Sequence, residues 1–192
     1  MTKDPFEARR KQLEEEYFRK KDAQLVDKLK AVFQKKIDKE SIRKATGITE
    51  ERLLDNLVAL NLSGELMSAF KLYPLVEIAW ADGNVDKREI RAVLAAAEHY
   101  GVVRGSAPYA LLENALKTRP RDDSRKAWYM YAAELRKVLN AQELETFRND
   151  LLEDARRVAE ASGGVLNLAF TVSGNEQKVL NAIKRALTHD AS

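Results

Sequence analysis

The long stretch that follows Pro5 constrains the fold more than any other feature of the sequence. It is highly charged and contains no Gly or Pro up to about Ile37. The start "DPFE" supplies Asp4 as a cap, Pro5 at the first helical position and Glu7 to complete a capping box. If this helix is continuous, its roughly 33 residues reach about 50 Å at 1.5 Å per residue.

The composition also favours helices over sheets. Eight Gly and four Pro in 192 residues are few for a turn-dense sandwich or barrel. Hydrophobic residues make up 45% and charged residues 33%, so a core can form beneath a heavily charged surface. No segment alternates convincingly with the period of two that marks a half-buried strand. We therefore expect an all-α fold, a helical bundle with a long N-terminal helical arm.

The sequence argues against several classes of protein. No apolar run approaches the ~20 residues that span a bilayer, and the start "MTKDPFEARRKQ" has no apolar signal segment. There is no Cys for a disulfide or a thiolate site, so we expect a cytoplasmic location. Residues 1–44 carry 14 Lys and Arg against nine Asp and Glu, and the rest carry 19 against 21. This balance is far from the dense basic stripe of a nucleic-acid-binding protein.

We expect two parts, a charged arm with a docking helix over residues 1–45 and a helical domain over residues 46–190. Apolar residues become regular only late in the first helix, at Leu25, Val26, Leu29, Val32 and Phe33. This later part is predicted to dock on the domain. A short helix over about 39–45 should end at Gly47, and Thr49 should cap the next one.

Within the domain, Pro and capping residues mark where helices begin and end. Pro74 predicts a break near Tyr73, and Ser106 with Pro108 should open a later helix. "RPRDDS" (119–124) reads as a turn, and "SGG" (162–164) should end the long helix before it. Capping boxes are predicted at three pairs of residues, Asp86 with Glu89, Asn140 with Glu143, and Ser173 with Glu176.

The stretch "AWADGNVDKREIRAVL" (79–94) allows two interpretations. In the first it only turns one helix into the next, with Gly83 in a left-handed conformation, Asp86 as the cap and Glu89 reaching back. In the second, the carboxylates of Asp82, Asp86 and Glu89 hold a Ca²⁺ or Mg²⁺ ion weakly. The spacing is not that of an EF-hand loop, because the twelfth position is occupied by Val93 and not by Glu.

This stretch, extended to "LVEIAWADGNVDKREIRAVLAAAEHYGV", resembles the tellurite-resistance TerB-like domain. The likeness continues through "SAPYALLENAL", "ASGGVLNLAF" and "VSGNEQKVLNAIKRAL", and it covers roughly residues 60–190. It implies an all-helical bundle, a bacterial stress-response setting and a role as an interaction module. In this family two related turns can face each other, which would add Glu176 to the cation ligands. The second turn lacks Asp-Gly and has Ser173 where the first has Asp86.

The arm is the candidate partner-binding segment. Aromatic side chains in a charged surround make good anchors for a protein partner or a second copy of the chain, and the arm offers Phe6, Leu13, Tyr17 and Phe18. A charged helix exposed to solvent is the alternative. The segment "ARRKQLEEEYFRKKDAQL" is also weakly similar to the start of bacterial ATP synthase inhibitor proteins, which implies inhibition by an inserted N-terminal helix.

The remaining candidate residues point to no reaction. His99 reads as a helix-end residue and His189 lies in the C-terminal tail; two isolated His without Cys do not make a zinc site. Trp80 and Trp128 lie on apolar helical faces and are predicted to pack in the core. There is no phosphate-binding Gly-rich loop and no nucleophile elbow. We expect a non-enzymatic protein that requires no cofactor.

Overall fold

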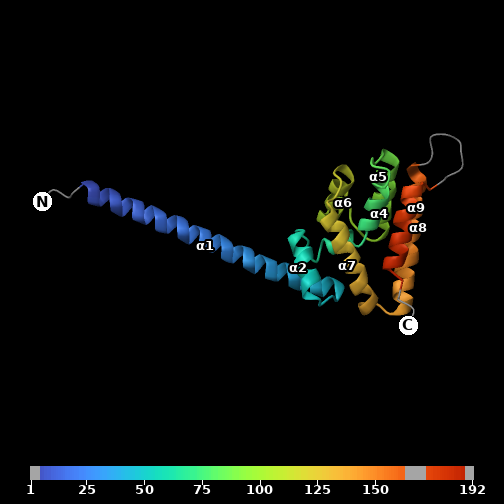
Figure 1. The fold of residues 1–192 in the computed structure, drawn as a ribbon, viewed down its shortest axis with the longest axis horizontal. Helices are drawn as coiled ribbons and strands as arrows, with labels where there is room; N and C mark the ends of the chain where they lie inside the picture. Colours follow the sequence, from blue (N-terminus) through green and yellow to red (C-terminus); the bar gives the residue numbers. More distant parts are fainter. Residues whose placement is uncertain (1–4, 163–171, 189–192) are drawn as a thin grey trace. The chain divides into compact units, whose positions relative to one another are not determined.

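The structure, a computed structural model, describes the backbone of residues 5–162 and 172–188. The side chains of residues 5–8, 10–15, 18, 22 and 162 also lie outside the described set. In the described ranges the chain forms helices α1 to α9 and no strand, which confirms the all-α prediction (Figure 1). The chain divides into two compact units, the first unit Met1–Asp38 and the body Lys39–Ser192.

Helix α1 (Pro5–Thr46) is one continuous helix of 42 residues. The predicted break after about Ile37 does not occur, because no Gly or Pro interrupts the backbone hydrogen bonds before Gly47. There the N–H of Gly47, with φ at 72°, donates to the Arg43 carbonyl at 2.9 Å. The predicted capping box at the start of α1 lies outside the described residues. Helix α1 crosses the boundary between the two units. This boundary follows Asp38 and lies earlier in the chain than the expected boundary at residue 45.

The apolar residues late in the first unit are exposed. Between 48% and 65% of each side chain is accessible at Leu25, Val26, Leu29, Val32, Phe33 and Ile37. We call these six residues the α1 stripe. Their spacing shows which face of the helix is apolar, but it does not show what covers that face.

The last turns of α1 belong to the body and are packed there. The Lys39 ammonium pairs with Glu51 at 3.1 Å and with Asp55 at 2.6 Å, both on α2 (Glu51–Ala59). Ile42 is fully buried, and the Ser41 hydroxyl accepts a hydrogen bond from the Gly64 N–H at 2.9 Å. Ile42 is therefore the first buried side chain among the described side chains of α1.

Helix α2 is capped by Glu50 and not, as predicted, by Thr49. The Glu50 carboxylate accepts hydrogen bonds from the backbone N–H groups of Arg52 and Leu53, so the longer side chain satisfies the orphan donors. Further on, α3 (Met67–Phe70) and α4 (Tyr73–Ala79) are separate helices, with Pro74 in the first turn of α4. This confirms the break predicted near Tyr73.

The core of the body is organised around α4, all seven residues of which are buried. Helix α4 contacts α5 (Lys87–His99), α6 (Ala107–Lys117), α8 (Ala141–Ser162) and α9 (Gly174–Ala186), as can be followed in Figure 1. Helix α7 (Asp122–Val138) buries Trp128, whose indole N–H donates to the Lys71 carbonyl at 3.3 Å. Trp80 is partly buried against the core. Both tryptophans therefore pack as predicted.

The predicted helix ends are mostly confirmed, but the turn predicted over 119–124 is shorter, because α7 already begins at Asp122. Ser106 caps α6, Asn140 and Glu143 exchange hydrogen bonds at the start of α8, and His99 is the last residue of α5. Helix α8 ends at Ser162, where "SGG" begins, but the two following glycines lie outside the described residues, as does His189.

We predict that Gly64→Ala destabilises the body. A Cβ at residue 64 would lie 2.3 Å from the carbonyl oxygen of Ser41, and a backbone atom cannot yield as a flexible side chain can. Overpacking of this kind costs about 1–3 kcal/mol, which should lower the Tm by several degrees in thermal unfolding. Gly174→Ala is the control, because nothing lies within 4 Å of the added Cβ. Equal Tm values for the two variants would contradict the packing of Ser41 on Gly64.

Candidate functional site

The Asp-Gly turn has the geometry of a helix connection. Gly83 has φ at 90°, in the left-handed region that favours glycine. Asp86 caps α5, with its carboxylate accepting from the N–H groups of Arg88 at 2.6 Å and Glu89 at 2.9 Å. The Glu89 carboxylate accepts from the Asp86 N–H at 2.8 Å in return. The predicted capping box is confirmed.

The second predicted turn lies beside the first. Ser173 and Glu176 form a capping box at the start of α9, with the Ser173 N–H donating to the Glu176 carboxylate at 2.6 Å. The Asp82 carboxylate accepts from the Ser173 hydroxyl at 3.1 Å and from the Asn175 amide at 3.4 Å. The two turns, 91 residues apart in sequence, are therefore joined through Asp82. We call Asp82, Asp86, Glu89 and Glu176 the paired-turn carboxylates.

Two of the paired-turn carboxylates are buried, which raises the pKa of one of them. Glu89 is 4% exposed and Glu176 is 2% exposed, whereas Asp82 and Asp86 face solvent. Burial raises the pKa of Glu89 to about 7, against the opposing hydrogen bond from the Asp86 N–H. The negative charges of Asp86, Glu176 and Asp82 raise the same pKa further. The Glu89 side chain is therefore partly protonated near neutral pH.

The paired-turn carboxylates are occupied mainly by the backbone of their own turns. Asp86, Glu89 and Glu176 each accept hydrogen bonds from main-chain N–H groups, and Asp82 accepts from the opposite turn. Among residues 5–162 and 172–188, no three His, Cys, Asp or Glu side chains converge in a group that could hold a metal ion. The capping role is established by the geometry, and weak cation binding stays a prediction.

Of the predicted partner anchors in the arm, Tyr17 alone has a described side chain. It is exposed, and the Lys21 ammonium lies over its ring at 5.0 Å from the centroid. The side chains of Phe6, Leu13 and Phe18 lie outside the described residues. The best-described apolar surface of the first unit is therefore the α1 stripe, which lies further along the helix than the predicted anchors.

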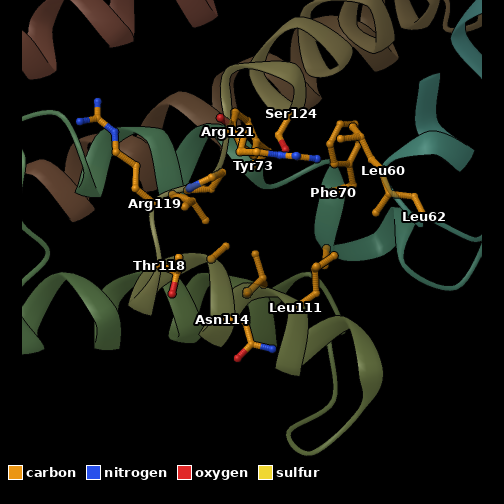
Figure 2. Close-up of a pocket in the computed structure, with 15 residues that line it drawn as sticks. Leu60, Leu62, Phe70, Tyr73, Leu111, Asn114, Thr118, Arg119, Arg121 and Ser124 are labelled. Atoms are coloured by element: carbon orange, nitrogen blue, oxygen red, sulfur yellow. The ribbon is translucent and has the colours of Figure 1, made fainter.

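The body also contains an apolar cleft that the sequence did not indicate (Figure 2). It has a volume of about 310 Å³ and lies between α3 and α4 on one side and α6 on the other, closed by the α6–α7 connection. Leu111 lies across from Leu60 and Phe70 in the close-up. Its lining is mostly apolar and contains no acidic residue: Leu60, Leu62, Ala69, Phe70, Tyr73, Val76, Leu111, Leu112, Asn114, Ala115, Thr118, Arg119, Pro120, Arg121 and Ser124.

An ion pair stands beside the cleft and sets its electrostatics. The carboxylate of Glu77, buried on α4, pairs with the Arg125 guanidinium at 2.5 Å. Burial raises the pKa of Glu77 while Arg125 lowers it. Burial, followed by the charge of Glu77, raises the pKa of Tyr73 in the cleft wall to about 12. The Tyr73 phenol therefore stays protonated at neutral pH.

The two arginines of the cleft rim were missed because "RPRDDS" was interpreted only as a turn. Arg119 and Arg121 flank Pro120 in the connection between α6 and α7. The lining residues of the cleft come from residues 60–76 and 111–124. Only the packing of α3, α4 and α6 brings these two segments together. No local spacing in the sequence signals such a site.

Comparisons with known proteins give no match. No protein-family model matches the chain, and neither the curated proteins nor the solved structures contain a significant match to it. A separate finding concerns membranes: within the described residues, no helix combines the length and the apolar character needed to cross a bilayer.

The first prediction for the paired turns concerns pH. Because the folded-state pKa of Glu89 is raised to about 7, the folded state holds more protons than the unfolded chain between about pH 4.5 and 7. Stability must then fall as pH rises through this window. Glu89→Gln keeps an acceptor for the Asp86 N–H and removes the charge. We expect its Tm to exceed that of the wild type by roughly 2–4 °C above pH 7 and to match it near pH 4.5.

The matched control for this prediction is Glu143→Gln, which changes the same residue type in the exposed capping box of α8. Differential scanning calorimetry between pH 4.5 and 8 measures all three proteins. A pH-independent difference between Glu89→Gln and the wild type would contradict the raised pKa.

The second prediction concerns cations. If the paired-turn carboxylates bind Ca²⁺ or Mg²⁺, the affinity should be weak, with a Kd of about 10⁻⁴ to 10⁻³ M as in loose oxygen-ligand sites. Calorimetric titration should then show heat for the wild type that Asp82→Asn reduces. A wild type with no heat and an unchanged Tm at several millimolar ion would leave only the capping role.

Proposed function

We propose that this chain is a non-enzymatic interaction module that uses the α1 stripe to dock a helix of a partner protein or of a second copy. The observation that supports this proposal is the exposure of six large apolar side chains on one helix. Contiguous exposed apolar surface is uncommon on proteins that act alone and commonly marks a binding surface.

The α1 stripe has the spacing of a helix-docking face. Its residues recur at intervals of three, four and seven from Leu25 to Ile37, which keeps them on one side of the helix. An amphipathic helix of this kind packs its apolar face against a groove or another helix. The stripe is therefore suited to a helical partner.

Basic residues on both sides of the stripe indicate the character of that partner. At about 100° per residue, Lys28 and Lys30 lie on opposite flanks of Leu29. All three side chains are exposed. A partner helix with an apolar face and acidic edges would complement both the apolar surface and the charge.

We also propose a TerB-like role for the body, in a bacterial stress response and in the cytoplasm. The support is the order of the quoted sequence pieces and the pairing of the Asp-Gly turn with the Ser173 turn through Asp82. The likeness names no partner. An interaction role agrees with a body whose two paired turns use their carboxylates as caps.

We predict that Leu29→Asp combined with Phe33→Asp abolishes the association that the α1 stripe mediates. Two charges on the face would have to be buried against the partner at a high cost. Sedimentation velocity measures self-association, and co-purification from native lysate with quantitative mass spectrometry measures partner binding. Because the substituted side chains are exposed, the stability of the body should change by less than about 0.5 kcal/mol.

The control places the same charges on the opposite face of α1, as Gln24→Asp with Ala31→Asp. This control should keep every association that the wild type shows. The proposal is contradicted if two results occur together. The wild type does not self-associate, and no co-purifying protein is lost in the stripe variant. A large fall in Tm for the stripe variant would show that the stripe is part of the core.

A further inference from the structure

The cleft between α3, α4 and α6 is built from well-fixed elements. The wall residue Ala115 accepts a hydrogen bond through its carbonyl from the Trp80 indole at 2.9 Å. The Phe70 ring lies 6.1 Å from Tyr73 and 6.0 Å from Tyr131, within the range of favourable aromatic pairs. The wall residues Ala115 and Phe70 are therefore held by contacts to Trp80 and Tyr131, which lie outside the cleft lining.

Arginines and carboxylates both lie around the rim, but the carboxylates lie outside the cleft lining. The nearby carboxylates of Glu77 and Asp122 both face Arg125, at 2.5 Å and 3.8 Å. Among the described residues, neither Arg119 nor Arg121 forms an ion pair or a hydrogen bond through its guanidinium. The cleft lining contains no acid. Burial raises the pKa of Glu77 while the charges of Arg125 and Arg119 lower it, so Arg119 is partly balanced by that buried carboxylate. Arg121 is therefore the rim cation that pairs with no carboxylate of the described residues, at the mouth of the apolar cleft.

The two rim arginines differ in position. In the close-up the Arg121 side chain lies near Ser124 and Phe70, whereas Arg119 points away from the opening (Figure 2). Arg121 also borders the adjacent depression, whose lining includes Asp123 and Lys126. Arg121 is thus the cation best placed to meet the head of a molecule in the cleft, with Ser124 as a neighbouring hydroxyl.

We propose that this cleft binds a single-chain amphiphile with a carboxylate head, such as a medium-chain fatty acid. Its alkyl chain would lie against Phe70, Leu111 and Val76, and its carboxylate would pair with the Arg121 guanidinium in the bidentate way that arginine favours. The volume of about 310 Å³ lies at the small end of small-molecule sites, which favours one short chain over a larger ligand. This site is independent of the α1 stripe and its partner.

The test titrates the full-length protein with sodium decanoate, below its micelle concentration, and follows the Trp80 indole N–H by ¹H–¹⁵N NMR. Saturable shifts are expected for decanoate, with weaker binding for the uncharged decanol. Butyrate should bind far more weakly still, because each buried methylene contributes about fourfold to affinity. No saturable shift with decanoate, or equal affinity for decanoate and decanol, would overturn the proposal.

Single substitutions test whether decanoate binds in this cleft. Arg121→Gln should weaken decanoate binding by about tenfold or more, as expected for loss of a charged hydrogen bond, and Arg119→Gln should weaken it less. Arg88→Gln, at an exposed arginine at the start of α5, should leave it unchanged. Leu111→Trp should block the cleft and prevent decanoate binding. The Tm of this variant should equal that of the wild type. Decanoate affinity that is unchanged in Arg121→Gln would overturn the assignment.

Discussion

The buried carboxylate of Glu77 is the constraint on which much of the body depends. Helix α4 is buried along its whole length and contacts α5, α6, α8 and α9, yet it carries this charged side chain. An unpaired carboxylate in the core would be costly, so α7 must bring Arg125 to it. That requirement fixes the start of α7 against α4. Arg119, in the preceding connection, also acts on Glu77 through its charge, whereas Arg121 lies in the cleft lining, which contains no acid.

The contrast between the body and the first unit follows from what each helix can bury. Helix α4 is enclosed by four neighbours, whereas residues 25–37 of α1 expose a complete apolar face. Helices gain most of their stability from packing such a face and little from intrinsic propensity. A helix that keeps its apolar face exposed is therefore stabilised further whenever a partner covers it. This is the physical basis for assigning the interaction role to α1.

Local features were predictable from the sequence, because a few adjacent residues decide them. The capping boxes at Asp86 and Ser173 and the break before Pro74 depend on single side chains and on the backbone limits of proline. The start of α2 was misplaced by one residue, since both Thr49 and Glu50 can cap. The covering of the α1 stripe and the cleft beside Arg121 depend on long-range packing. Periodicity alone carries no information about either.

We infer that the α1 stripe is uncovered in the free chain, whereas the last turns of α1, from Lys39, are packed in the body. Native-state hydrogen–deuterium exchange of the dilute full-length protein tests this directly, because amides exchange according to the local cost of opening. Amides of residues 20–37 should exchange much faster than those of residues 40–46, which lie on the same helix, and they should slow when the stripe is occupied. Equal, strong protection along all of α1 in the dilute monomer would contradict the claim.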